Sequence, residues 1–157
     1  MTKQTWQQWV GVAALVAAGS VAVLASVSDG RPDRSPDEGR CTDRTVRGDY
    51  GFSIDGTILA GTPNAFLLRG VAMTHFDGDG GLTQVDFTTR NGAPTTADWR
   101  GATGSYAINP DCTGTAEIVP SDGSPALRLR LVVVDHGREI RTIVVGNASG
   151  SVGIRTN

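Results

Sequence analysis

Beyond residue 40 the chain consists of short runs in which apolar and polar positions alternate, separated by glycine-rich turns. Tyr50, Phe52 and Ile54 lie at alternating positions, and a further apolar pair follows at 58–59. A period of two is typical of half-buried β-strands. Similar runs predict further strands at residues 66–76, 82–90, 104–108, 113–119, 127–134, 139–145 and 152–154. The pattern therefore predicts seven or eight strands.

The clearest pair of strands is a hairpin that joins 127–134 to 139–145 and turns at His136 and Gly137. This turn predicts a register in which Val133 opposes Ile140, Leu131 opposes Thr142, and Leu129 opposes Val144. These six side chains form one nearly continuous apolar face, which we expect to be buried. The opposite face carries four branched aliphatic residues among its arginines, and these predict self-association: Val132, Val134, Ile143 and Val145.

Glycine makes up 21 of the 157 residues, and good helix formers are scarce beyond residue 30. Many glycines coincide with predicted strand junctions: Gly48, Gly56, Gly61, Gly78, Gly80, Gly81, Gly92, Gly114, Gly123 and Gly137. Short connections place sequential strands side by side. The fold class is therefore predicted to be all-β, an antiparallel up-and-down barrel, with a two-sheet β-sandwich as the alternative.

The first 25 residues have the features of a signal peptide. Lys3 precedes an apolar stretch at 10–25, and small residues before Ser26 predict cleavage after Ala25. An uncleaved membrane anchor is the alternative. Residues 26–40 are predicted to be a disordered linker and 41–157 the barrel domain. Both alternatives place the barrel outside the cytoplasm, as a secreted, periplasmic or cell-envelope domain.

Charge and cysteine content narrow the possible partners. From residue 41 onward ten arginines stand against twelve carboxylates, so the basic excess of a nucleic-acid-binding protein is lacking. Cys41 and Cys112 are the only cysteines, and in an oxidising compartment they predict one disulfide. The sequence has no clustered cysteine and histidine ligands, and we expect neither a metal nor a cofactor.

Four segments resemble a family of small exported bacterial barrel proteins of largely unknown function. They are 48–52 (GDYGF), 76–82 (FDGDGGL), 104–115 (GSYAINPDCTGT) and 133–140 (VVDHGREI). The family is similar in fold to the allene oxide cyclase and lipocalin barrels, which are grouped as calycins. The resemblance extends from about residue 41 to the end of the chain and implies a barrel. Its motifs are turns and strand starts, so it implies no catalytic residues.

The first functional hypothesis is that the lumen binds a small apolar ligand, because a barrel of this size can leave room for one molecule. Its predicted lining comprises eight residues: Tyr50, Phe52, Phe66, Phe87, Tyr106, Leu129, Leu131 and Ile140. Trp99 and Arg100 follow a loop that we place at the barrel mouth. A lumen smaller than a drug-sized molecule would contradict this hypothesis.

Two other hypotheses follow. The outer faces suit a structural or interaction module of the cell envelope, which we rank second. Similarity to allene oxide cyclase suggests a cofactor-free cyclase or isomerase, ranked third. Such an enzyme acts mainly by holding its substrate in a productive shape. His75 and Asp86 are the candidate polar groups for its site. The sequence thus favours a binding protein over an enzyme.

Overall fold

The computed structural model describes residues 40–59 and 61–156, and these fold around one β-sheet. The predicted signal peptide and nearly all of the predicted linker lie outside the described residues. None of the helices in the described ranges is long and apolar enough to span a membrane.

The described chain contains nine strands and two short 3₁₀-helices. Their bounds, in chain order, are η1 (Asp43–Val46), β1 (Gly48–Ile58), β2 (Phe66–Phe76), β3 (Gly81–Arg90), β4 (Ala93–Pro94), β5 (Arg100–Ile108), β6 (Thr113–Pro120), β7 (Leu127–Val134), η2 (Asp135–Gly137), β8 (Glu139–Val144) and β9 (Ala148–Arg155).

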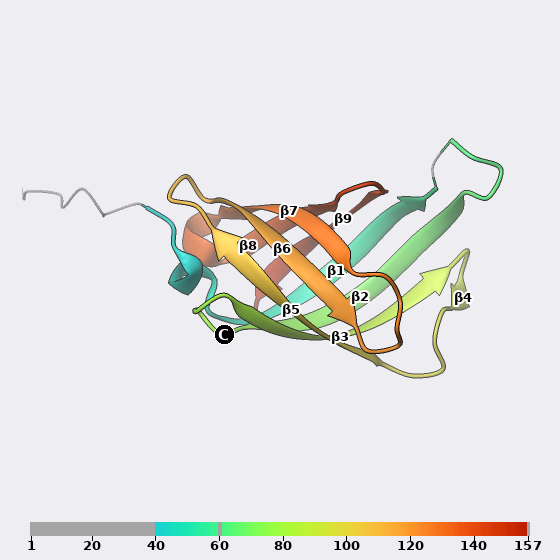
Figure 1. The fold of residues 1–157 in the computed structure, drawn as a ribbon, viewed down its shortest axis with the longest axis horizontal. Coiled ribbons are helices and arrows are strands. Elements are labelled where there is room, and N and C mark those ends of the chain that lie inside the picture. Colours follow the sequence, from blue (N-terminus) through green and yellow to red (C-terminus); the bar gives the residue numbers. More distant parts are fainter. Residues whose placement is uncertain (1–39, 60, 157) are drawn as a thin grey trace, which may run out of the picture. The chain divides into compact units, whose positions relative to one another are not determined.

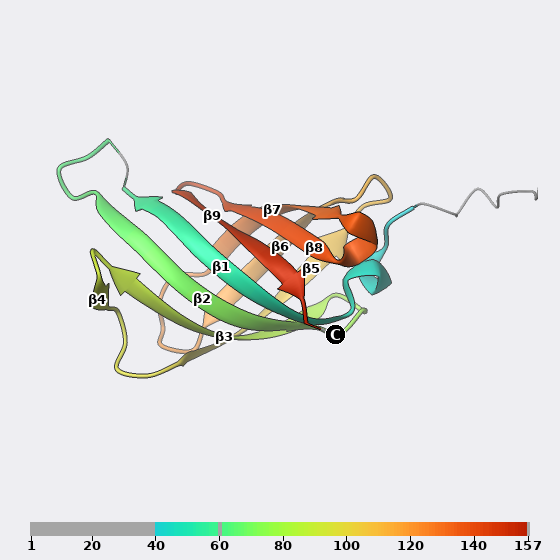
Figure 2. The ribbon, with the colours of Figure 1, turned by 180° about the vertical axis from the view of Figure 1, so that it is seen from behind.

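Eight of these strands form a closed antiparallel barrel. Each long strand pairs with the next one along the chain, and β9 pairs back with β1, so the sheet has no free end. Only the two-residue β4 lies outside the ring, against the end of β3. Figures 1 and 2 show the strands running obliquely around a common axis. The up-and-down barrel is therefore confirmed, and a sandwich is excluded because one continuous sheet closes on itself.

The predicted register of the β7–β8 hairpin is confirmed, with Val133 opposite Ile140 and Leu129 opposite Val144. Its turn differs from the predicted two-residue turn. Asp135, His136 and Gly137 all have positive φ angles, of 48°, 55° and 83°, and form the one-turn helix η2. The loop is therefore longer than predicted, although the strand register is the same.

Three strand boundaries also differ from the prediction. β1 runs without a break through Gly56, which is a strand residue and not a corner. β5 begins at Arg100, four residues before the predicted start, and β9 begins at Ala148. Both extensions contain small or polar residues whose pairing depends on the neighbouring strand, so local hydrophobicity is a poor guide to them.

One end of the barrel, which we call the lower end, carries η1 and η2. Aromatic side chains and these two short helices close it. Tyr50 and Tyr106 each pack edge-to-face against Phe76, with ring centroids 5.5 and 4.9 Å apart. Beneath them Val46 of η1 is fully buried. The Cys41–Cys112 disulfide, with a Cα–Cα distance of 5.0 Å, ties the segment before η1 to the β5–β6 turn. The predicted disulfide is thus present.

Hydrogen bonds fix the same closed end. The hydroxyl of Tyr50 donates to the carbonyl of Gly137 in η2 and accepts from the guanidinium of Arg155, whose Nη2 lies 2.7 Å away. The same Nη2 atom donates to the carbonyl of Thr45 in η1 at 2.7 Å. One arginine from the last strand therefore joins both short helices to the buried tyrosine, and the free opening lies at the other end.

Candidate functional site

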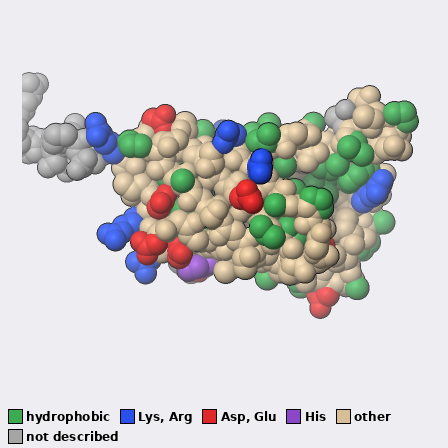
Figure 3. Space-filling view, viewed as in Figure 1, with side chains coloured by type: hydrophobic (Ala, Val, Ile, Leu, Met, Phe, Trp, Pro, Cys, Tyr) green, Lys and Arg blue, Asp and Glu red, His purple; other side chains and the backbone are tan. Residues whose placement is uncertain are grey.

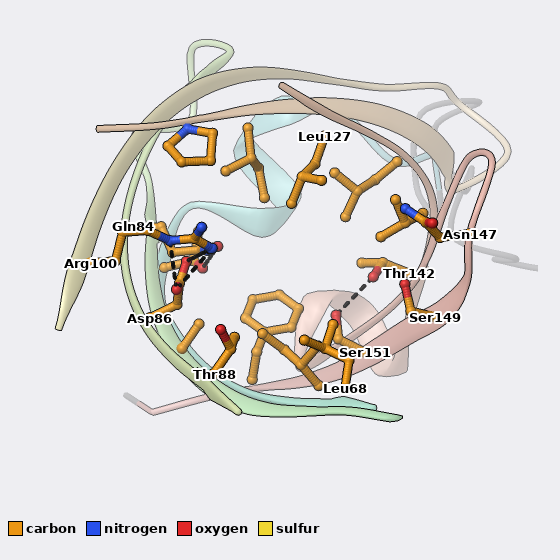
Figure 4. Close-up of a pocket in the computed structure, with 18 of the residues that line it drawn as sticks. Leu68, Gln84, Asp86, Thr88, Arg100, Leu127, Thr142, Asn147, Ser149 and Ser151 are labelled. Atoms are coloured by element: carbon orange, nitrogen blue, oxygen red, sulfur yellow. Dashed lines mark hydrogen bonds and ion pairs between the residues drawn. The ribbon is translucent and has the colours of Figure 1, made fainter. Parts of the chain in front are cut away.

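The lumen holds a cavity of about 520 Å³ that opens at the end opposite the short helices. Figure 4 looks along it and shows side chains converging from all around the barrel wall. Ligand pockets typically have volumes of about 300–1,000 Å³. The side chains of this barrel therefore leave its interior unfilled, and the space is large enough for a drug-sized molecule.

Small residues at inward-facing positions keep the lumen open. Ala72 and Ala116 line the cavity, and Gly153 faces Phe52 so closely that a Cβ atom there would overlap the Phe52 ring. Gly70 likewise leaves room for the side chain of Thr88 on the neighbouring strand. Glycine thus has two roles in this fold. It forms turns, and at inward positions it leaves space for the side chains of neighbouring strands.

Most of the predicted lining residues face the barrel interior, in two groups. Phe52, Phe66, Leu129, Leu131 and Ile140 line the cavity itself. Tyr50 and Tyr106 are buried in the aromatic layer that closes the lower end and are not among the cavity-lining residues. The two tyrosines therefore form the floor of the barrel and not its binding space.

Phe87 lies on the outer face of β3, in contrast to its predicted place in the lumen. Its ring packs against Trp99, with the ring centroids 6.1 Å apart. The reason is the strand period of two, because β3 turns Asp86 and Thr88 inward and therefore Phe87 outward. A polar residue takes the inward position where a hydrophobic one was expected.

A polar cluster lies on the inner wall at β2, β3 and β5. Asp86 and Arg100 are direct partners in the β3–β5 ladder, and Arg100 donates to both Asp86 oxygens at 3.1 and 3.2 Å. Gln84 donates to Asp86 at 3.0 Å and accepts from the hydroxyl of Thr74 at 2.9 Å. The side chain of Asp86 is only 4% exposed. Its charge is therefore satisfied by three donors within the wall.

Arg100 links this cluster to the mouth of the barrel. It also donates to Asp122 in the β6–β7 loop at 3.3 Å. Burial alone would lower the pKa of Arg100, but the hydrogen bonds and negative charges of Asp86 and Asp122 outweigh it and raise the pKa. The guanidinium therefore stays charged, with the carboxylate of Asp86 beside it.

A second group of polar side chains lies across the lumen on β8 and β9, as Figure 4 shows. The hydroxyls of Thr142 and Ser151 are cross-strand partners and lie 2.8 Å apart. Ser149 is only 4% exposed and lines the cavity, and its hydroxyl makes no hydrogen bond to another described residue. Asn147 lies nearer the mouth on the same side. The lumen thus has two polar sides separated by apolar wall.

His75 and Asp86, the candidate polar groups for an enzyme, lie on opposite faces of the barrel wall. Asp86 points into the lumen, whereas His75 is exposed outside, where its Nδ1 lies 2.7 Å from a carboxylate oxygen of Asp49 on β1. The two side chains therefore cannot act on one substrate. Within the described residues, neither histidine nor cysteine lines the cavity, and no cluster of acidic, cysteine or histidine side chains could hold a metal ion.

Sequence reasoning missed most of the polar lining, namely Gln84, Thr142, Ser149 and Ser151. A signal for one side existed, because Leu82, Gln84, Asp86, Thr88 and Arg90 all occupy the same face of one strand. Such a series of polar residues at the inward positions indicates a polar inner wall. On the other side, the inward position of Thr142 on β8 was predicted, whereas Ser149 and Ser151 are small residues on β9, most of which lies outside the predicted strand 152–154.

The outer faces carry scattered apolar and charged side chains. Val132, Ile143 and Val145 are exposed, as expected for the face opposite the β7–β8 core side, but Arg141 lies directly opposite Val132 and interrupts the patch. A second exposed apolar group contains Val71, Met73 and Val85 on β2 and β3. Figure 3 shows charged side chains of both signs distributed over one face. Self-association stays a prediction.

Comparisons with protein-family models, with curated proteins and with solved structures find no match to this chain. The class of protein is therefore defined by the fold and the site alone. It is a closed eight-stranded antiparallel β-barrel with a lumen open at one end. The resemblance to the calycin barrels agrees with this architecture, and membership of that family stays a prediction.

Proposed function

We propose that this protein binds a small, mostly apolar molecule in the lumen of its barrel. The observation that carries the proposal is the cavity of about 520 Å³, which is lined largely by aliphatic and aromatic side chains and opens at one end. Burial of apolar ligand surface contributes roughly 25 cal/mol per Å², so a ligand enclosed on most sides gains a large favourable term. Calycin-like binding proteins use a lumen in the same way.

The arrangement of the wall supports a binding role. The aromatic side chains Tyr50, Phe76 and Tyr106 fill the lower end, and hydrogen bonds hold η1 and η2 against it. Aliphatic residues and small residues line the space above. A rigid floor and a preformed cavity reduce the conformational entropy that binding would otherwise lose.

Export of the protein belongs to the same proposal. The Cys41–Cys112 disulfide supports it, because such bonds persist in oxidising compartments. The apolar N-terminal stretch supports it further. Expression of the full chain in a bacterial host, followed by intact-mass measurement of the exported protein, tests it. We expect a mature chain that begins at Ser26, and a chain that retains residues 1–25 would indicate an anchor.

Binding is tested with N-phenyl-1-naphthylamine, an apolar dye whose fluorescence increases in an apolar site. The variant Ala116→Leu adds bulk at an inward position of β6, and Thr115→Leu adds a similar side chain at the exposed neighbouring position as the matched control. We expect saturable binding to the wild type, about tenfold weaker binding to Ala116→Leu, and unchanged binding to Thr115→Leu.

Two results would contradict lumen binding. One is the lack of saturable dye binding by protein whose circular dichroism shows a folded barrel. The other is an equal loss of affinity in the two variants, because the outward leucine leaves the cavity unchanged. Unfolding curves of both variants serve as the check that the inward leucine is accommodated.

A further inference from the structure

The two polar sides of the lumen limit the chemistry of its ligand. Figure 4 shows Gln84, Asp86 and Arg100 on one side and Thr142, Ser149 and Ser151 on the other. Apolar wall, including Leu68 and Leu127, separates the two sides. A ligand enclosed by this wall therefore meets polar groups at two opposite edges and hydrocarbon between them.

The β3–β5 side presents hydrogen-bond donors to the lumen. Arg100 has five N–H donors, and three of its bonds go to Asp86 and Asp122. One Nε2 hydrogen of Gln84 is bonded to Asp86, which leaves the other free. The oxygens of Asp86 and the amide oxygen of Gln84 already accept hydrogen bonds. Donor capacity is therefore left over at Arg100 and Gln84, and it suits a ligand acceptor such as a carbonyl oxygen.

Charge balance favours a neutral ligand. Four charged side chains line the cavity, and they cancel: Asp86 and Asp122 against Arg90 and Arg100. The inner pair, Asp86 and Arg100, are bonded to each other. Burying an ionic ligand beside a neutralised pair would leave its charge uncompensated, which is costly in a low-dielectric interior.

The position of Ser149 indicates where the second polar edge of a ligand would lie. Its side chain lines the cavity and is more than nine-tenths buried, yet its hydroxyl is unpartnered among the described residues. Gly56, directly opposite on β1, makes the space for it. No fully buried side-chain oxygen among the described residues lacks a partner, so the Ser149 hydroxyl is open to the cavity, where it can bond an oxygen function of a bound molecule.

We propose that the lumen binds a neutral molecule with an oxygen function at each of two opposite edges and hydrocarbon between them, of the diketone type. One carbonyl accepts from Gln84 and Arg100, and the other accepts from the hydroxyl of Ser149. The apolar body of the ligand lies between them, against Leu68 and Leu127. This inference rests on the proposed lumen-binding function and adds the class of ligand to it.

Three naphthalenes of similar shape test the proposal by competition with N-phenyl-1-naphthylamine. They are 2,6-diacetylnaphthalene, which is neutral with a carbonyl at each edge, 2,6-diethylnaphthalene, which has no oxygen, and naphthalene-2,6-dicarboxylate, which is anionic. We expect the diketone to compete about tenfold more strongly than the hydrocarbon and the dianion to compete least. The variant Ser149→Ala lacks the hydroxyl, so it should bind the diketone about fivefold more weakly than the wild type does. Its affinity for the hydrocarbon should stay the same.

The matched control is Ser53→Ala, which removes an exposed hydroxyl from the outer face of β1 and should change neither competitor. Three results would overturn the ligand class and leave lumen binding intact. The dye could bind without any preference of the site for the diketone, or the dianion could compete best. The third result is that Ser149→Ala loses affinity equally for both neutral compounds. Failure of the dye itself to bind contradicts the proposed function and this inference together.

Discussion

Gly56 on β1 lies directly opposite Ser149 on β9, and the missing side chain of Gly56 leaves the space that Ser149 occupies. A Cβ atom at Gly56 would overlap both the Cα and the Cβ atoms of Ser149. The φ angle of Gly56 is also 154°, which L residues rarely adopt. One glycine inside a strand thus sets how closely the two strands that close the barrel approach each other.

The variant Gly56→Ala should therefore be more destabilising than a glycine replacement without overlap. Gly48→Ala is the matched control, because Gly48 has a φ angle of 130° and open space where its Cβ would lie. We expect Gly56→Ala to lower the free energy of unfolding by about 1–3 kcal/mol more than the control, the usual cost of overpacking. Urea unfolding measures both, and equal losses would contradict the prediction.

Removing the Tyr50 hydroxyl should loosen the closed end. The variant Tyr50→Phe deletes the bond to the Gly137 carbonyl and leaves Arg155 without one acceptor. We expect a loss of about 1–3 kcal/mol in the free energy of unfolding, as for other buried hydrogen bonds. Hydrogen exchange of the backbone amides should become faster in η2 and stay slow in the central strands. Such a pattern would show that the destabilisation is local to the closed end. Unchanged exchange at η2 would contradict it.

Stability should also fall at alkaline pH. Burial raises the pKa of Tyr50, and the Arg155 hydrogen bond offsets only part of that effect. Because the folded pKa lies above the unfolded value of about 10, the neutral phenol favours folding below that pH. This contribution is lost as the pH rises toward the folded pKa. Unfolding between about pH 9 and 11 measures it, and Tyr50→Phe should flatten the slope.

At acid pH the turn carboxylates should destabilise the fold. The backbone N–H groups of Asp79 and Gly81 hold the pKa of Asp77 below its usual range. Thr113 does the same for Asp111, and Ser124 for Asp122. A lowered folded pKa means that stability is present above the unfolded value of about 3.9 and is lost below it. We expect the urea concentration at the midpoint of unfolding to decrease as the pH falls below about 4. This decrease should be smaller for Asp77→Asn. A flat profile would contradict this.

Loss of the disulfide should destabilise the barrel without changing its architecture. Cys41 and Cys112 are 71 positions apart, so the closed loop is long, and the chain-entropy model gives an upper limit of about 4 kcal/mol. The double variant Cys41→Ser with Cys112→Ser should keep a β-type circular dichroism spectrum and unfold at lower urea. The wild type in dithiothreitol serves as the comparison. Equal stability of the two proteins without reductant would contradict the prediction.

The sequence by itself determined most of the strands and the order in which they pair, although it missed the starts of β5 and β9 and the length of the β7–β8 turn. Strict alternation from Leu127 to Leu131 predicts both the strand and its buried face, because a strand has a side-chain period of two. Short connections leave sequential strands few ways to pair except with each other. The count of two cysteines, together with the predicted export, predicts the disulfide. The strand pattern and the pairing order depend on residues that are close together in the chain, so the sequence alone predicts them.

Only the tertiary structure decided that the barrel is open inside and where its polar groups meet. Asp86 and Arg100 are 14 positions apart and become partners through the β3–β5 register. Ser149 faces the lumen because Gly56, on a strand distant in sequence, leaves it room. The number of strands does not set the empty volume. That volume depends on how the side chains of all eight barrel strands fill a shared space, and no local pattern encodes that sum.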